Sequence, residues 1–165
     1  TLEKSILRLL DKLGPKKIVI VSSAPQIRYP DCYGIDMSKV KEFVAFRAML
    51  ELLKDRDMEN KKEEVYNKIL SLQEKGNLKK ENVVKELFDL FTPDEVSDKI
   101  AEIIAPEGIE AEVSVVFQTV ENLNAACPQH LGDWYFTGNY PTPGGNKVVN
   151  KAFLNFMEGK YVRAY

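Results

Sequence analysis

The chain has 165 residues, of which 44% are hydrophobic, and a formal net charge of −2 at pH 7. This size suits one domain, or a small domain with an appendage, and the weak charge gives no electrostatic basis for binding nucleic acid or an anionic membrane. Two cysteines form no disulfide framework, so we expect a cytoplasmic protein. The polar start suggests no signal peptide, and no apolar run approaches the roughly 20 residues that span a bilayer.

The first 23 residues predict a helix, a turn and a buried strand. The helix covers residues 2–13, and its apolar face consists of Leu2, Ile6, Leu9, Leu10 and Leu13. Gly14-Pro15 ends this helix. Residues 17–23 follow with a continuous apolar run, which is typical of a parallel strand covered on both faces. This order is the second half of a β-α-β unit, whose first strand would lie upstream of Thr1.

The rest of the chain is predicted to be mostly helical. Two prolines and a Tyr-Gly pair make residues 25–37 an ordered loop, and residues 127–146 are loop-like for similar reasons. Thr92-Pro93-Asp94-Glu95 is a capping box with proline at the first helical position. The further elements are helices at 38–54, near 65–72, at 84–91 and from 93 to about 105, a strand at 112–118, a short helix at 119–126, and a last helix through Val149 to Phe156. The pattern predicts an α/β protein.

Three stretches resemble glutamine phosphoribosylpyrophosphate (PRPP) amidotransferase, also called amidophosphoribosyltransferase. Residues 22–36 read S-S-A-P-Q-I-R-Y-P-D-C-Y-G-I-D, similar to the segment behind the PRPP loop in that family, and residues 42–45 are similar to its E-L-I-A. The unit at about 93–118 resembles a helix and strand of the family. Residues 136–141, F-T-G-N-Y-P, are similar to its F-T-G-K-Y-P. Residues 47–92 have no counterpart in this resemblance.

The resemblance implies the C-terminal portion of a PRPP-loop phosphoribosyltransferase, a Rossmann-like α/β fold, with a mostly helical insertion. Residues 1–46 would be a helix-strand-loop segment of that fold. Residues 47–92 would be the insertion. Residues 93–165 would be the C-terminal helix-strand-helix segment and tail.

The resemblance also implies an activity for a longer protein. The family makes 5-phosphoribosylamine from PRPP and glutamine, the first committed step of de novo purine biosynthesis. Its nucleophilic cysteine, its pyrophosphate loop and the acidic pair that binds the ribose hydroxyls or magnesium all lie upstream of the matching segment. We therefore expect no catalytic residue in this chain and no activity from it alone. A homo-oligomer and inhibition by purine nucleotides are further family expectations.

Two residues are candidates for contact with substrate or ammonia. The resemblance makes Thr1 the last threonine of the PRPP loop, where a hydroxyl at a helix start binds the 5′-phosphate. From the residues alone Thr1 is a plain N-cap. Phe43 matches a family position that lines the ammonia channel, which needs apolar walls. The other interpretation of Phe43 is core packing on a helix face.

The signature loop, residues 22–36, is a candidate edge of the nucleotide pocket. The residues that carry this prediction are Pro30, Tyr33, Gly34, Ile35 and Asp36. The alternative is a structural turn, because glycine permits unusual backbone angles and Asp36 can cap the next helix.

The positions that hold an iron–sulfur cluster in some family members are degenerate here. Asp31 stands where one cysteine ligand is expected, with Cys32 one residue later. The family's C-x-x-C reads Cys127-Pro128-Gln129-His130. Because thiolates hold such clusters, these replacements argue against one, and we expect packing and hydrogen bonds in its place. A zinc site at Cys127, His130 and Cys32 or Asp31 is the alternative that ligand chemistry leaves open.

A second function class is consistent with the same residues. The chain can derive from a non-catalytic relative that keeps the phosphoribosyltransferase scaffold as a ligand-sensing or protein-interaction module. The sequence upstream of Thr1 discriminates the two. The enzyme needs two acidic residues and a Gly-Thr just before Thr1 and a cysteine at the far N-terminus, whereas a sensor can keep the phosphate loop but needs no glutaminase domain.

Overall fold

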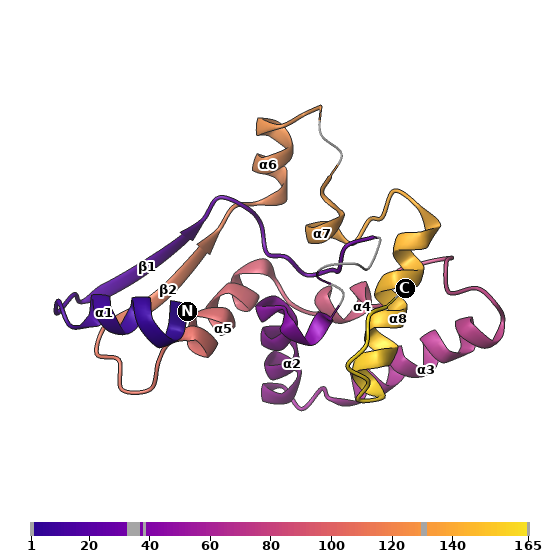
Figure 1. Cartoon of the computed structure of the whole chain (residues 1–165), viewed down its shortest axis with the longest axis horizontal. Coiled ribbons are helices and arrows are strands. Elements are labelled where there is room, and N and C mark those ends of the chain that lie inside the picture. The colour runs from indigo at the N-terminus through magenta and orange to yellow at the C-terminus, as the bar shows by residue number, and fades with distance from the viewer. Residues whose placement is uncertain (1, 33–36, 38, 130–131, 165) are drawn as a thin grey trace.

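The computed structural model describes residues 2–32, 37, 39–129 and 132–164 (Figure 1). Its strands are β1 (Lys17–Ser22) and β2 (Glu112–Phe117). Its helices are η1 (Leu2–Leu7, a π-helix), α1 (Arg8–Asp11), η2 (Val40–Glu42, a 3-10 helix), α2 (Val44–Asp55), α3 (Asn60–Glu74), α4 (Lys85–Phe88), α5 (Pro93–Ile104), α6 (Val120–Ala126), α7 (Trp134–Thr137) and α8 (Pro143–Met157). The predicted α/β class is confirmed. In the described residues no helix is both long and apolar enough to cross a lipid bilayer.

The two strands form a parallel sheet. They pair in register from Lys17 opposite Glu112 to Ser22 opposite Phe117, and the first pair is joined by an ion pair of 2.7 Å between exposed side chains. Because parallel strands need a long crossover between them, the whole segment from 23 to 111 separates the two. Figure 1 shows the sheet with α1 at one end of the molecule and α2, α3, α4 and α8 gathered at the other.

Only one face of this sheet is covered. Ile18 of β1 packs with Leu7 and Ala111 in a small cluster, and α5 packs against β2. On the opposite face Val19, Val21 and Val116 are 49%, 73% and 51% exposed. The prediction of a strand covered on both faces is therefore wrong for this chain, since its described helices supply one covering layer only.

The N-terminal helix turns a different side to the sheet than predicted. Leu7 is fully buried, whereas Leu9 and Leu13 of the predicted apolar face are 66% and 80% exposed. Residues 2–7 form a π-helix, whose i→i+5 hydrogen bonds widen each turn. The 3.6-residue period used for the prediction therefore does not apply there, and the buried face is rotated.

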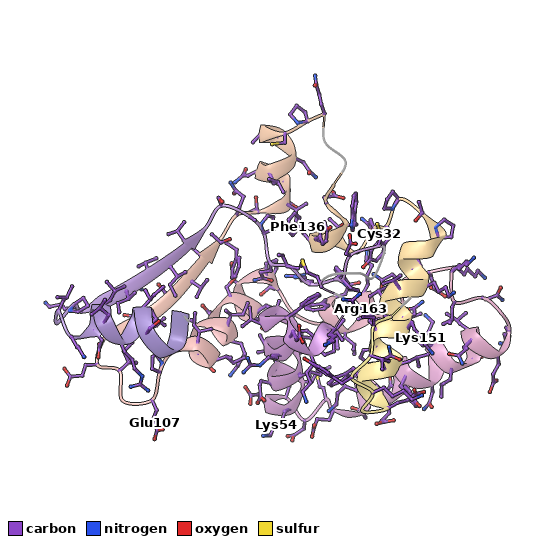
Figure 2. The ribbon with its side chains drawn as sticks, viewed as in Figure 1. Cys32, Lys54, Glu107, Phe136, Lys151 and Arg163 are labelled. Atoms are coloured by element: carbon purple, nitrogen blue, oxygen red, sulfur yellow. The ribbon has the colours of Figure 1, made fainter. Side chains whose placement is uncertain are left out.

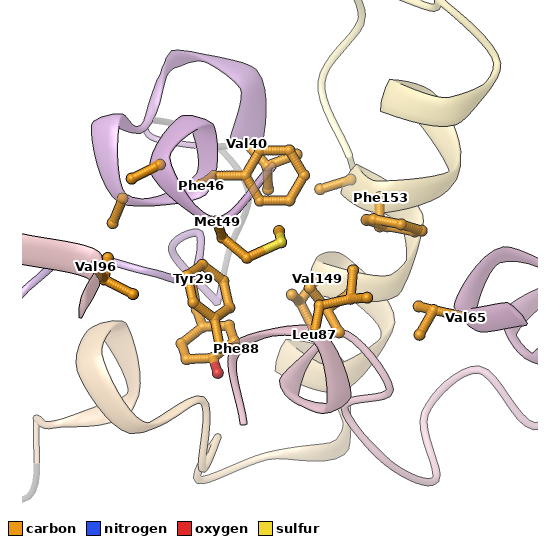
Figure 3. Packing of buried hydrophobic residues seen from close by; sticks show 14 of the residues in the cluster. Tyr29, Val40, Phe46, Met49, Val65, Leu87, Phe88, Val96, Val149 and Phe153 are labelled. Carbon is orange, nitrogen blue, oxygen red and sulfur yellow. The ribbon is translucent and has the colours of Figure 1, made fainter. Parts of the chain in front are cut away.

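The main hydrophobic core lies among α2, α3, α4, α5 and α8 (Figure 3). It contains residues from each of the three predicted segments, for example Tyr29, Met49 and Phe153. Aromatic rings meet edge to face in it: the Phe46 and Phe156 centroids are 5.0 Å apart and those of Tyr29 and Phe88 are 5.3 Å apart. Such pairs add to the stabilisation that burial of their area provides. The domain division at residues 46 and 92 stays a prediction.

Asn150 of α8 is the fully buried polar residue that ties the core to the turn after α3. Its side-chain oxygen accepts a hydrogen bond from the Val83 amide at 3.2 Å. Its side-chain nitrogen donates to the carbonyls of Leu78 and Glu81 at 3.0 and 2.8 Å. The buried side-chain oxygen and nitrogen of Asn150 are thereby both satisfied, which is the condition for burying them without a penalty.

The predicted capping box at α5 is confirmed. The Thr92 hydroxyl accepts a hydrogen bond from the Glu95 amide, and the Glu95 carboxylate accepts one from the Thr92 amide. Three boundaries differ from prediction. α2 begins at Val44 rather than at 38, and α4 is a single turn. The expected loop at 127–146 contains α7 and the start of α8.

Candidate functional site

The loop that follows β1 has several buried residues although it contains no regular element. Pro25, Gln26, Tyr29 and Pro30 are all buried. The Gln26 side-chain nitrogen donates hydrogen bonds to the Pro93 carbonyl at 2.8 Å and to the Ser97 hydroxyl at 2.7 Å. The signature loop is therefore attached through Gln26 to the first turn of α5.

Arg28 extends this attachment. Its Nε and Nη2 both donate to the Gln26 side-chain oxygen, at 3.0 and 2.7 Å, and its guanidinium carbon lies 5.4 Å from the centroid of the Phe88 ring. Burial lowers the pKa of Arg28, while Tyr29 and Asp89 act in the opposite direction. The guanidinium remains charged, since its ordinary pKa is far above neutrality, and is fixed by a side-chain amide and an aromatic face.

A cavity of about 300 Å³ opens beside this loop, at the carboxyl ends of β1 and β2. α5 and α6 contribute walls, and Phe136, labelled in Figure 2, enters from α7. In open parallel sheets ligands bind outside the carboxyl ends of the strands, so this cavity is the candidate site. Its lining residues are Pro25, Gln26, Arg28, Pro93, Asp94, Ser97, Asp98, Val115, Val116, Phe117, Gln118, Thr119, Val120, Glu121 and Phe136.

The lining defines which ligand groups the cavity favours. Asp94, Asp98 and Glu121 contribute carboxylates, and Arg28 is the only cationic side chain among the described lining residues. The valines and phenylalanines of the wall offer apolar surface. The carboxylates therefore favour hydrogen-bond donors such as hydroxyl groups, and any anionic part of a ligand would have to lie against Arg28. The described lining includes no histidine or cysteine.

Asp31 and Cys127, two of the degenerate cluster positions, do not line the cavity. The carboxylate of Asp31 accepts a hydrogen bond of 2.8 Å from the Tyr135 hydroxyl. Burial and this hydrogen bond raise the pKa of Tyr135 to about 12. Cys127 is exposed and follows α6, and Cys32 is half-buried (Figure 2). In the described part of the chain no group of three or more His, Cys, Asp or Glu side chains is placed to hold a metal ion.

Of the other predicted site residues, only Pro30 and Phe43 lie among the described residues. Pro30 is buried, and Phe43 is half-buried at the N-cap of α2, where it packs against the main core. Neither lines the cavity. The remaining predicted residues lie outside the described ones: Thr1, Tyr33, Gly34, Ile35, Asp36 and His130.

Sequence reasoning missed the residues that form the cavity wall, above all Gln26, Arg28, Ser97 and Asp98. A signal was present for Gln26 and Arg28, but not for Ser97 and Asp98, which lie within α5. Gln26 comes three residues after the strand predicted at 17–23, Thr119 comes directly after the one predicted at 112–118, and the carboxyl ends of parallel strands lie at one edge of a sheet. The first residues after each strand were thus candidates to meet.

The fold and cavity define a class: an α/β protein with a parallel sheet and a potential ligand site at its carboxyl edge. Within that class, part of the chain is similar to amidophosphoribosyltransferases. Those of Pasteurella multocida and Haemophilus influenzae are each 44% identical to it over 46 residues, which are 28% of this chain and 9% of the relative. That of Escherichia coli is 40% identical over 45 residues, 27% of this chain and 9% of the relative.

These matches confirm the resemblance to amidophosphoribosyltransferase over roughly a quarter of the chain. The matched stretch spans only about a tenth of each relative's length. No family model matches the chain, and no solved structure matches it. The phosphoribosyltransferase fold itself therefore stays a prediction.

Proposed function

We propose that this chain is the C-terminal part of an amidophosphoribosyltransferase, whose complete form makes 5-phosphoribosylamine from PRPP and glutamine in purine biosynthesis. The observation that carries the proposal is the stretch of 46 residues with 44% identity to two such enzymes. The parallel sheet and the cavity at its carboxyl edge support it, because phosphoribosyl transfer on a Rossmann-like fold would take place at that edge.

The catalytic machinery would be supplied by the upstream part of the longer protein. Among the described residues, no three metal-ligating side chains lie close enough together to hold a metal ion. We therefore assign magnesium, which would neutralise the pyrophosphate of PRPP, to acidic residues upstream of this chain. The role of this chain would be to complete the fold, with Phe43 in the wall of the ammonia channel and the signature loop at the pocket edge. A cytoplasmic homo-oligomer inhibited by purine nucleotides is part of the same proposal.

Assays of the full-length protein and of the isolated chain test this function. The full-length protein is expected to release pyrophosphate from PRPP in the presence of glutamine or ammonia, and to form glutamate only with glutamine. The isolated 165-residue chain is expected to do neither. A full-length protein with no PRPP-dependent activity under both nitrogen sources would contradict the proposal, and so would turnover by the isolated chain.

A non-catalytic sensor is the second candidate. The described cavity lining has wall groups suited to binding but no histidine or cysteine. For a sensor, the full-length protein would bind PRPP or a purine nucleotide in calorimetry without consuming it. The same two preparations therefore discriminate the candidates.

A further inference from the structure

The backbone of the signature loop is held by two tyrosines that follow it by more than 100 residues. The amides of Arg28 and Tyr29 both donate hydrogen bonds to the Tyr135 carbonyl, at 2.9 and 3.1 Å. The Tyr135 hydroxyl donates to Asp31 at 2.8 Å, and the Tyr140 hydroxyl donates to the Pro30 carbonyl at 2.7 Å. Four consecutive loop residues thus contact one short segment.

This segment has little room to move away from the loop. A Cβ on Gly145 would come within 2.2 Å of the Tyr140 ring, and a Cβ on Gly138 would come within 2.9 Å of the Tyr29 ring. Glycine is therefore the residue that lets α8 approach Tyr140 and lets the segment approach Tyr29. Burial, and next the neighbouring Tyr29, raise the pKa of Tyr140 well above its ordinary range, so its hydroxyl is a neutral donor at any working pH.

The held residues lead directly to the cavity. Arg28 is the cation of the described wall, and Gln26, which fixes its guanidinium, lies two residues before it. The backbone of this stretch belongs to no helix or strand, so its hydrogen bonds to Tyr135 and Tyr140 help to set its path, together with the attachment of Gln26 to α5 and the burial of Tyr29. A change in that path would displace Arg28 from the position where it meets an anionic group.

We propose that Tyr135 and Tyr140 are positioning residues, which hold residues 28–31 so that Arg28 stands ready for the anionic substrate of this site. The proposal rests on the function proposed above, with PRPP as that substrate. Neither tyrosine lines the cavity. The two tyrosines would act through the loop. We therefore expect their substitution to weaken substrate binding more than it slows the turnover of bound substrate.

The test replaces each tyrosine by phenylalanine in the full-length protein, which removes the hydroxyl and keeps the ring. Losing one neutral hydrogen bond corresponds to about 5-fold in an equilibrium constant. We therefore expect Tyr140→Phe to raise KM for PRPP about 5-fold, with kcat within 2-fold of wild type, and the double variant with Tyr135→Phe to raise it further. The control is Tyr161→Phe, because that hydroxyl contacts Glu42 rather than residues 28–31.

An unchanged KM in the double variant would overturn the proposal, and so would an equal rise in Tyr161→Phe. A merely structural role would lower the fraction of active protein, and hence kcat, at constant KM. Hydrogen exchange of the Arg28 and Tyr29 amides gives a second readout that needs no activity. Tyr140→Phe is expected to speed this exchange about 5-fold without changing the exchange of α3 amides, and no change there would also refute the idea. If the wild-type protein lacks activity, the proposed function fails while the exchange measurement still decides on the two tyrosines.

Discussion

Replacing a glycine by alanine can destabilise a protein through backbone strain or through steric crowding. Three glycines of this chain allow these two effects to be measured separately. Gly138, after α7, has a φ of +71°, and a Cβ there would lie 2.6 Å from the Asn82 side chain and 2.9 Å from the Tyr29 ring. Gly76 has a nearly equal φ of +68° but nothing within 4 Å of its Cβ position. Gly145 has no positive φ, yet its Cβ would lie 2.2 Å from Tyr140. The first position combines strain with crowding, and each of the others has one of them.

The magnitudes follow from this geometry. A left-handed backbone costs an alanine about 1–2 kcal/mol, and overpacking of a tight site costs about 1–3 kcal/mol. We expect Gly76→Ala to lower the free energy of unfolding by about 1–2 kcal/mol and Gly145→Ala by about 1–3 kcal/mol. Gly138→Ala should combine the two terms, about 2–5 kcal/mol.

Urea unfolding of the three variants measures these differences. Far-UV circular dichroism follows the helices, and fluorescence of Trp134, which stacks on Tyr135, follows the segment near Gly138. Comparable m-values are required, since a changed m-value would indicate a changed denatured state or lost two-state behaviour. If Gly138→Ala and Gly76→Ala lower the free energy of unfolding equally, the close approach of Gly138 to Tyr29 and Asn82 contributes nothing to stability, which would refute this prediction.

Three further predictions concern a cap, a buried amide and a titrating phenol. Thr92→Ala removes the hydroxyl half of the capping box with Glu95 and should cost about 0.5–2 kcal/mol in urea unfolding; no measurable loss would contradict the cap's role. Asn150→Leu leaves the buried Val83 amide and the less buried Leu78 and Glu81 carbonyls without this partner and should cost about 1–3 kcal/mol, so a loss well under about 1 kcal/mol would contradict the role of this amide. The pKa of Tyr135 is raised to about 12, above the ordinary value near 10 in the unfolded chain. The neutral phenol therefore stabilises the folded state at pH below about 10, and this contribution is lost as the pH rises towards about 12. Tyr135→Phe should accordingly lose less stability than wild type between pH 10 and 11, and equal losses in urea midpoint would refute the assignment.

Local signals in the sequence were sufficient for several elements. The capping box at Thr92 needs only residues within one turn, and it was predicted and found. The two strands were placed within one residue because apolar runs bounded by turn residues define them. The start of α8 at Pro143 was missed, although Thr142-Pro143 places proline at the first helical position just as Thr92-Pro93 does.

The errors arose where distant residues decide the local backbone. The chain at Phe43 is extended, so α2 begins after it, while the preceding residues Lys39 and Glu42 contact Tyr161 from the tail. Helical periodicity contains no information about such a contact. The cavity was missed for the same reason, since four separate segments meet there and no single window of sequence contains their arrangement.

The parallel pairing of β1 with β2 also determines the order in which this chain can fold. Lys17 and Glu112 are 95 residues apart in sequence, and closing a flexible loop of that length costs about 4 kcal/mol beyond a constant. The intervening helices form from local contacts and shorten the effective distance, so we expect them to assemble first. At synthesis rates of about 5–20 residues per second, β1 waits roughly 5–20 s for its partner strand, and during this time Ile18 and Ile20, which lie on the covered face of the folded sheet, are in water. We therefore expect the chain to be most vulnerable on the ribosome, where a chaperone that covers short apolar strands would protect the emerging Ile18 and Ile20.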